Sequence, residues 1–332
     1  MRVLCVVALL AVFLAGGLAL GHHSDAGYDQ GRVIGLQGEV TRFLWRNPHI
    51  TVYMETENQA GERVEWGLEA GSTPIMTRSG WTPDLFASGD EITVRAHPDR
   101  SHRTHAMMIS IEKADGSVWI QDEADYPATA STTTFDGVWK GIAETLSPFN
   151  RQLNSQALTP AGESAKAEYN YQTDSPIADC IPPPPPGSTI GSTVYINEIE
   201  VLDDRVIIRS EFFDASRTVY MDGRGHPANG ERTNLGHSVG RWEGDVLVVD
   251  TTLFADHPSA NGSGVPSGAR KHLVERYVLS EDGTRLIVDF VMEDPEFMIE
   301  PFSARKELLF APQLELLTYD CDPDLSRQSG FE

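Results

Sequence analysis

Hydrophobic and polar side chains alternate along much of this chain, which is the pattern of β-strands that bury one face. The clearest example is residues 237–254, HSVGRWEGDVLVVDTTLF, in which two strand-like runs meet at Glu243 and Gly244. A short turn containing glycine between β-branched or aromatic runs predicts a β-hairpin. Similar runs flank it on both sides, so we expect this hairpin at the centre of an antiparallel sheet that fills the C-terminal half.

The remainder of the C-terminal half shows the same alternation. Asp282 and Gly283 indicate a second tight hairpin, and Thr159 and Pro160 indicate the start of a single helix over 158–171. Eight or nine antiparallel strands with short turns predict an up-and-down barrel that can hold one small ligand. The further strands are expected at 193–202, 205–213, 217–223, 272–280, 285–293, 303–311 and 315–321.

The N-terminal half predicts a smaller β-domain. Five short strand-like runs within about 80 residues favour an OB-like barrel, and 72–86 reads as helical or irregular, with a helix start at 81–84. The runs lie at 33–45, 49–56, 63–70, 90–96 and 106–112. The whole chain is therefore expected to be all-β, with these two barrels and one short helix.

Composition marks the boundaries between these parts. After residue 113 the chain becomes rich in Ser, Thr, Ala, Asp and Pro, as inter-domain segments often are. We divide the chain into a signal segment (1–21), an OB-like domain (22–125), a linker (126–136) and a lipocalin-like domain (137–332).

The first 21 residues have the features of a secretory signal. Arg2 precedes an apolar run at 3–14, and Ala19-Leu20-Gly21 fits the small-x-small cleavage pattern. The apolar run is too short for a membrane span, and no other stretch is long enough. We therefore expect a bacterial periplasmic or secreted protein with no membrane span after the signal is removed.

Loss of the signal leaves two of the three cysteines, Cys180 and Cys321. An even pair in an exported chain predicts a disulfide. It would close a loop of about 140 residues, which contributes roughly 4 to 5 kcal/mol in the chain-entropy account. Two free thiols or a thiolate metal site are the alternatives.

The formal net charge of −23 limits the classes of partner. A strongly acidic surface repels phosphate backbones and makes nucleic acid an unsuitable partner. It favours cations, including metal ions, although an acidic surface can also serve solubility alone. The sequence contains no nucleotide or flavin motif.

The predicted cleavage would make His22 the first residue of the mature chain. A free α-amine and an imidazole on one residue form a bidentate nitrogen chelate, and a third nitrogen from His23 or His49 would complete a histidine brace suited to copper. The alternative is a polar, mobile terminus without function. The other histidine group, His97, His102 and His105, is more simply a polar loop, because arginines lie among its members.

Histidines and acids also recur in the C-terminal half. His226, His237, His257 and His272 could gather at one mouth of the barrel, with Asp222, Asp250 or Glu275 as partners, in an acid–base or metal site. We take His237, His272 and Asp250 as the candidate catalytic set. The alternative is that these residues only hold strands and turns together.

Two further sets of residues bear on chemistry. Gly236-His237-Ser238-Val239-Gly240 matches the G-x-S-x-G pattern, but a serine hydrolase needs a strand-to-helix elbow that a β-hairpin does not provide. A ligand pocket in the barrel could be lined by polar and aromatic side chains from several strands. The candidates are Tyr195, Arg209, Tyr220, Arg241 and Tyr277.

Both halves resemble exported bacterial proteins. His22-His23-Ser24, the run GLQGEVTRFLWRNPHI at 35–50 and the Gly80-Trp81 pair resemble a bacterial family of small exported domains of unknown function. In the second half, Met221 to Arg224, Gly236 to Asp245 and Val274 to Tyr277 resemble exported proteins for which the resemblance implies a lipocalin-like barrel. Neither resemblance implies an activity.

Two functional hypotheses follow. The first is a periplasmic binding protein that holds copper at its mature N-terminus and a small, partly apolar ligand in its C-terminal barrel. The second is an enzyme, such as an isomerase, cyclase or hydrolase, acting on a small molecule inside that barrel. A convergent histidine–acid pair at the floor of the ligand cavity would favour the enzyme, and an apolar cavity without one would favour binding.

Overall fold

The architecture was analysed in a computed structural model of the 332-residue chain. It describes residues 27–328, except for 59, 122–129, 143–144, 146–151, 154, 171–173, 175, 188–194 and 257–264. The predicted signal segment, His22, His23 and His257 lie outside the described residues.

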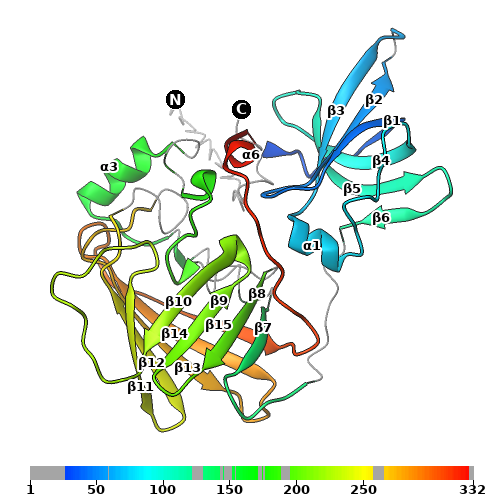
Figure 1. Cartoon of the computed structure of the whole chain (residues 1–332). Helices are drawn as coiled ribbons and strands as arrows, with labels where there is room; N and C mark the ends of the chain where they lie inside the picture. The colour runs from blue at the N-terminus through cyan, green and yellow to red at the C-terminus, as the bar shows by residue number, and fades with distance from the viewer. Residues whose placement is uncertain are drawn as a thin grey trace, which may run out of the picture.

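The N-terminal domain is a closed barrel (Figure 1). Five strands run in the order β3-β2-β1-β4-β5, and β3 closes the ring by pairing in parallel with β5, with Gly67 opposite His105. This arrangement confirms the OB-like barrel. The strands are β1 (Ile34–Leu44), β2 (Thr51–Glu57), β3 (Arg63–Glu69), β4 (Glu91–Pro98), β5 (His105–Lys113) and an added edge strand, β6 (Val118–Ile120).

The helix of this domain begins earlier than expected. It is α1 (Thr73–Arg78), whereas 81–84, the predicted helix start, forms a turn. Asn47 explains the position, because its buried side chain accepts a hydrogen bond from the Thr73 backbone N–H (2.8 Å) and donates one to the Thr73 hydroxyl (2.7 Å). A free N–H at the first turn of a helix is thereby paired.

The C-terminal domain is a closed barrel of nine strands, as the alternation predicted. Its ring order is β7-β8-β9-β10-β11-β12-β13-β14-β15, with β15 returning to β7. The strands are β7 (Gly137–Gly141), β8 (Ile196–Val201), β9 (Arg205–Ser210), β10 (Ala215–Tyr220), β11 (His237–Glu243), β12 (Val246–Thr252), β13 (His272–Leu279), β14 (Arg285–Glu293) and β15 (Phe302–Phe310).

One strand pair departs from the expected antiparallel pattern. β10 and β11 are parallel, with Val219 opposite Ser238. A closed ring with an odd number of strands cannot be antiparallel throughout, so one parallel pair is required. The long loop at 221–236 makes this crossover, and it carries His226.

Short helices complete the described part of the chain. The expected helix is confirmed as α3 (Pro160–Glu168), and the Thr159 side chain caps it by accepting from the Gly162 N–H (3.1 Å). Another helix, α6 (Pro323–Gln328), follows Cys321. Among the described residues, no helix is both long and apolar enough to cross a membrane.

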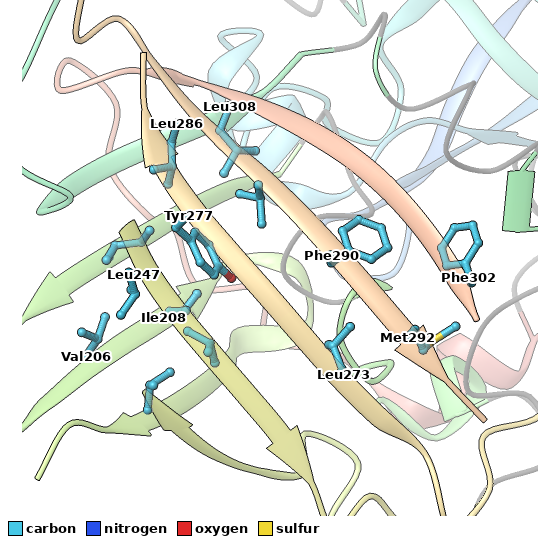
Figure 2. Packing of buried hydrophobic residues seen from close by; sticks show 14 of the residues in the cluster. Val206, Ile208, Leu247, Leu273, Tyr277, Leu286, Phe290, Met292, Phe302 and Leu308 are labelled. Atoms are coloured by element: carbon cyan, nitrogen blue, oxygen red, sulfur yellow. The ribbon is translucent and has the colours of Figure 1, made fainter. Parts of the chain in front are cut away.

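The interior of the nine-stranded barrel is mainly apolar (Figure 2). Inward positions follow the two-residue period of each strand. On β12, for example, Leu247 and Val249 belong to the core while Asp250 between Val249 and Thr251 does not. The residues labelled in Figure 2 illustrate this core: Val206, Ile208, Leu247, Leu273, Tyr277, Leu286, Phe290, Met292, Phe302 and Leu308.

The segment 315–321, predicted as a last strand, pairs with no strand. Its backbone donors go to carboxylates instead: the Leu317 N–H donates to Glu211 (2.9 Å) and the Tyr319 N–H to Asp214 (2.8 Å). The segment crosses to the first barrel and ends in the predicted disulfide, which is confirmed between Cys180 and Cys321 with a Cα–Cα distance of 5.7 Å.

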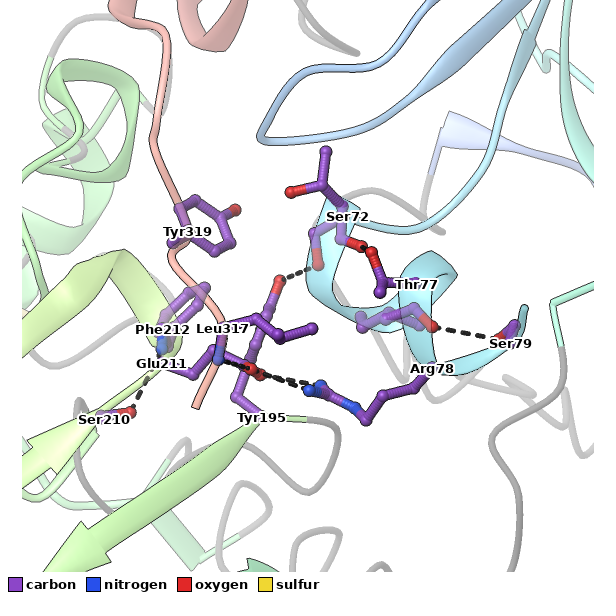
Figure 3. Close-up of polar contacts among 12 residues, drawn as sticks. Ser72, Thr77, Arg78, Ser79, Tyr195, Ser210, Glu211, Phe212, Leu317 and Tyr319 are labelled. Atoms are coloured by element: carbon purple, nitrogen blue, oxygen red, sulfur yellow. Dashed lines mark hydrogen bonds and ion pairs between the residues drawn. The ribbon is translucent and has the colours of Figure 1, made fainter. Parts of the chain in front are cut away.

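This segment helps to join the two barrels (Figure 3). Tyr195, Phe213 and Tyr319, from the second half of the chain, belong to the same hydrophobic cluster as the core of the first barrel. Around them, Arg78 of α1 forms a bidentate ion pair with Glu211 at 2.7 Å, and the Tyr195 hydroxyl is 3.0 Å from that of Ser72. The barrels therefore share a packed, partly charged interface.

Candidate functional site

Four polar residues meet on the outer wall of the C-terminal barrel. His237 starts β11, Asp250 lies on β12, His272 starts β13 and His226 comes from the crossover loop. Asp250 and His272 alternate with the buried residues Thr251 and Leu273, so their side chains face outward. We call His226, His237, Asp250 and His272 the outer-wall cluster.

Hydrogen-bonding distances connect the cluster into a chain. Nε2 of His226 and Nε2 of His272 each lie 3.0 Å from the same oxygen, Oδ1 of Asp250. Nδ1 of His226 lies 2.9 Å from Nδ1 of His237, and Nδ1 of His272 lies 4.0 Å from Oε2 of Glu293. The carboxylate of Asp250 therefore orients two imidazoles, and one of these orients a third.

The surroundings of the cluster are partly shielded. His237 stacks on Tyr220 with ring centres 5.3 Å apart, and Arg224 lies 4.1 Å above the same tyrosine ring. Burial lowers the pKa of His237, and the neighbouring His226 and Arg224 lower it further. This lowered pKa favours the neutral form of the His237 imidazole.

The sequence predicted three members of this cluster, His237, Asp250 and His272, as a catalytic set and indicated His226 as a possible neighbour. It placed them at the mouth of the barrel, on the ligand side, whereas the structure places them outside. Of the acids considered with them, Glu275 faces the interior, and Asp222 pairs with Arg224. Their proposed catalytic role stays a prediction. A hollow of about 280 Å³ lies on the same wall and is lined partly by Val274, which pairs with Asp250.

The barrel interior contains a different polar group. Arg217 donates to both oxygens of Glu275 (2.5 and 3.1 Å), and the Tyr277 hydroxyl donates to Glu275 (3.0 Å). All three side chains are buried. Burial would lower the pKa of Arg217, but Glu275 and Tyr277 raise it above its usual value. The group is an ion pair within an apolar core, in which the charge of Arg217 is compensated by that of Glu275.

The five predicted ligand residues do not share one pocket. Tyr277 faces the barrel interior, and Tyr195 lies in the interface between the barrels. The other three lie on outer surfaces: Arg209 is paired with Glu198 and Glu200, Tyr220 is stacked on His237, and Arg241 is paired with Glu243. Their role in ligand binding stays a prediction.

A larger hollow, which we call the end pocket, lies at the end of the barrel formed by the β11–β12 turn. Its volume is about 600 Å³. Phe135 and Trp242 form an aromatic pair in its wall, with ring centres 5.3 Å apart, and Asp136 and Asp245 add carboxylates. The sequence did not single out these residues; Trp242, half-exposed in the structure, lies on the first strand of the hairpin that the sequence indicated.

Trp139 holds one wall of the end pocket in place. It is fully buried, packs against Phe310 and donates from its indole nitrogen to the Phe135 carbonyl (3.0 Å). It thereby fixes the segment that forms one wall of the pocket.

On the N-terminal barrel, His49 lies beside a buried acid. Its Nδ1 is 3.1 Å from Oε1 of Glu69, and Oε2 of the same carboxylate accepts from the Tyr28 hydroxyl (3.2 Å). Tyr28 pairs with Asp99 in an isolated β-bridge. The start of the described chain is therefore attached close to His49.

The remaining candidates show no such convergence. Within the described residues, no three His, Cys, Asp or Glu side chains are already arranged around a metal position. Nδ1 of His97 lies 2.8 Å from the Arg32 carbonyl oxygen, and the His105 ring packs against Gly67. Ser238 of the G-x-S-x-G match is buried inside the barrel on a strand and bonded to Thr251 (2.8 Å), which is not the geometry of a nucleophile elbow.

Comparison with known proteins adds a family and a fold neighbour. Residues 11–108 match a family of unknown function (DUF6152), which confirms the uncharacterised family expected for the N-terminal part. No curated protein matches the chain. A mutant of the fluorescent protein UnaG is similar at 15% identity over 53% of this chain and 96% of its own, with a TM-score of 0.26, a likeness too weak to support an argument.

Proposed function

We propose that this protein is an exported binding protein that takes a small, partly apolar ligand in the end pocket and copper at its mature N-terminus. The observation that carries the proposal is the end pocket itself. A volume of about 600 Å³ falls in the range of small-molecule sites, and an aromatic pair beside two carboxylates is a typical lining for such sites. The disulfide is consistent with a periplasmic or secreted location.

The lining also indicates the charge of the ligand. Asp136 is partly engaged by the Val201 N–H (2.7 Å), whereas the side chain of Asp245 is in an exposed turn. An aromatic face attracts cations, and the chain carries a net charge of −23. The ligand class that fits best is therefore a flat, partly apolar amine.

A matched pair of probes tests this proposal. Tryptamine and indole-3-acetate share one ring system and differ in the sign of their charge, and calorimetry can measure both. We expect tryptamine to bind more tightly, Trp242→Ala to weaken it at least tenfold, and Trp242→Phe to retain most of the affinity. Asp245→Asn should reduce the preference for the amine, and Glu231→Gln, on an exposed loop, should not. Equal binding of both probes to all variants would refute the proposal.

The copper part of the proposal rests on the position of Tyr28. It lies six positions after His22, a span of at most about 20 Å, so the mature N-terminus can reach His49. The carboxylate of Glu69 lies 3.1 Å from Nδ1 of His49 without the geometry of a hydrogen bond, and Nε2 remains for a ligand role. Metal-binding histidines usually have a carboxylate near their other nitrogen. His22 would supply its amine and imidazole, with His23 or His49 as the third nitrogen.

Copper binding can be tested by calorimetry and electron paramagnetic resonance. Protein starting at His22 should bind copper tightly with a nitrogen-rich signal, and protein with one extra N-terminal alanine should not. His49→Ala should weaken binding if His49 is the third ligand, while His102→Ala serves as the control. Equal binding by native and extended protein would exclude the N-terminal chelate.

The alternative of an enzyme acting inside the barrel is less well supported. Among the described residues, no histidine lines the end pocket, and the histidine–acid cluster lies on the outer wall. By the criterion set from the sequence, a cavity without a convergent histidine–acid pair favours binding.

A further inference from the structure

We infer that the outer-wall cluster is a binding site for a divalent transition-metal ion, with Zn²⁺ as the ion that fits best. This site is separate from the end pocket and from the proposed N-terminal copper site. The ligands would be Nε2 of His226, Nε2 of His272 and a carboxylate oxygen of Asp250, and solvent would complete the coordination.

As they stand, the described residues contain no group of three side chains arranged to hold a metal ion, so the ligands of this cluster must move slightly apart to admit one. Zinc bonds of about 2.0 to 2.2 Å in a tetrahedral arrangement place neighbouring ligand atoms about 3.4 Å apart. The two imidazole nitrogens lie 3.0 Å from the same Asp250 oxygen, so an expansion of a few tenths of an ångström admits the ion. Two imidazoles and one carboxylate form a ligand set used by zinc and by other first-row metals.

The other nitrogen of His226 is within hydrogen-bonding distance of a partner, whereas that of His272 only lies near a carboxylate, too far for a hydrogen bond. Nδ1 of His226 faces Nδ1 of His237 at 2.9 Å, and Nδ1 of His272 faces the Glu293 carboxylate at 4.0 Å. Metal-binding histidines almost always donate this second N–H to a neighbouring group, which fixes the ring. The cluster therefore provides the ligands and, for His226, a group that orients it.

The protons balance without a change in total charge on the histidines. Without an ion, Nε2–H of each imidazole donates to Asp250, and His226 accepts from the His237 Nδ1–H. When an ion binds, the Nε2 positions carry lone pairs and the protons reside on Nδ1. His226 then donates from Nδ1 to Nδ1 of His237, whose own proton moves to its Nε2, so the hydrogen bond persists with its direction reversed.

The location suits ion exchange with solvent. Two ligands come from neighbouring strands of a rigid barrel, and the side chains of His226, Asp250 and His272 are 23%, 30% and 37% exposed. An ion can therefore enter without unfolding, while the sheet holds Asp250 and His272 in place. The large negative charge of the chain favours accumulation of cations at its surface.

The test uses full-length mature protein with one extra N-terminal alanine, which disables the proposed copper chelate. Zn²⁺ is titrated by calorimetry, and Co²⁺ reports coordination through its visible absorption. We expect one Zn²⁺ per chain, a tetrahedral Co²⁺ spectrum that Zn²⁺ abolishes, and a rise in the unfolding temperature on adding Zn²⁺.

Substitutions then locate the ion. His272→Ala and Asp250→Asn should each weaken Zn²⁺ binding by a hundredfold or more, and His237→Ala by about tenfold because it only orients His226. His49→Ala and His102→Ala are controls and should bind as the parent does. Circular dichroism confirms folding, and His272→Asn replaces any variant that fails to fold. No binding by the parent, or binding unaffected by the cluster substitutions, would overturn the inference.

Discussion

At the scale of single residues, the direction of each side chain decides its chemistry. Glu275 and Arg276 are neighbours on β13, yet Glu275 is buried against Arg217 while Arg276 is half-exposed and pairs with Glu243. The same alternation places Asp250 outside the barrel and Thr251 inside it. A one-residue shift in register would exchange these environments.

The buried pair of Arg217 and Glu275 leads to a first prediction. Arg217→Met leaves a buried carboxylate without its partner and should lower the free energy of unfolding by about 3 to 5 kcal/mol. The double variant Arg217→Met/Glu275→Leu should recover most of this loss. Urea denaturation measures both, and Arg305→Met, which breaks the exposed pair with Asp289, is the control with an expected cost of about 1 kcal/mol or less. A double variant as unstable as the single one would contradict this account.

Asp99 leads to a second prediction, on pH. Burial would raise the pKa of Asp99, but hydrogen bonds from Arg103 and from the Ser101 N–H outweigh it and lower the pKa. The resulting stability is present above the ordinary aspartate pKa of about 4 and is lost as the pH falls towards the lower pKa of the folded protein. Asp99→Asn should therefore cost about 1 to 3 kcal/mol at pH 7. The difference between wild type and variant, measured by denaturation, should shrink below pH 4; a constant difference would exclude the charge as its cause.

At the scale of elements, turns and connecting segments hold the end pocket together. The β13–β14 turn supports the segment that contributes Phe135, because the Thr132 N–H donates to the Gly283 carbonyl (3.0 Å). Gly283 itself has a φ of +67°, and an added methyl group would lie 2.2 Å from the Thr132 carbonyl oxygen. The turn thus requires glycine both for its positive φ and for the close approach of the Thr132 carbonyl.

A third prediction concerns this turn. Gly283→Ala should destabilise the barrel by about 1 to 3 kcal/mol, since it combines an unfavourable φ with a clash, and should also weaken tryptamine binding in the end pocket. Gly116→Ala, which has a similar φ of +84° and open space around it, is the matched control and should lose only about 1 kcal/mol. Thermal unfolding and calorimetry distinguish the two. Equal effects of both variants would show that the contact with Thr132 is unimportant.

At the scale of the whole molecule, the two barrels are joined by a buried ion pair, an aromatic cluster and the crossing segment at 315–321. Glu211 has a fully buried side chain and receives Arg78 from the first barrel and the Leu317 N–H from the crossing segment. The disulfide anchors the end of that segment. These contacts predict that the barrels unfold together.

A fourth prediction tests this coupling. Arg78→Met removes the partner of a buried carboxylate and should cost about 3 to 5 kcal/mol, and calorimetric unfolding should split into two transitions as the barrels separate. Arg46→Met breaks another inter-barrel ion pair, with Asp322, but Arg46 is 63% exposed, so little change is expected. A single transition in Arg78→Met at an unchanged temperature would show that the ion pair does not couple the barrels.

The sequence by itself determined the local features of this protein. The two-residue alternation predicted most strands of both barrels because burial of one face requires it, although it missed β6 and β7 and wrongly included 315–321. Asp282-Gly283 and Thr159-Pro160 predicted a turn and a helix cap because those conformations depend on neighbouring residues. The pairing of Cys180 with Cys321 followed because only two cysteines remained after the predicted signal.

Only the tertiary structure decided what depends on ring closure and on contacts between distant residues. The parallel β10–β11 pair follows from closing a ring of nine strands. The segment 315–321 does not form the predicted strand because Glu211 and Asp214, about 100 residues away, accept hydrogen bonds from its N–H groups. The orientation of the strands places the side chains of His237, Asp250 and His272 on the outer wall. The crossover loop places His226 beside them. Such contacts leave no local pattern in the sequence, because they are fixed by the packing of the whole chain.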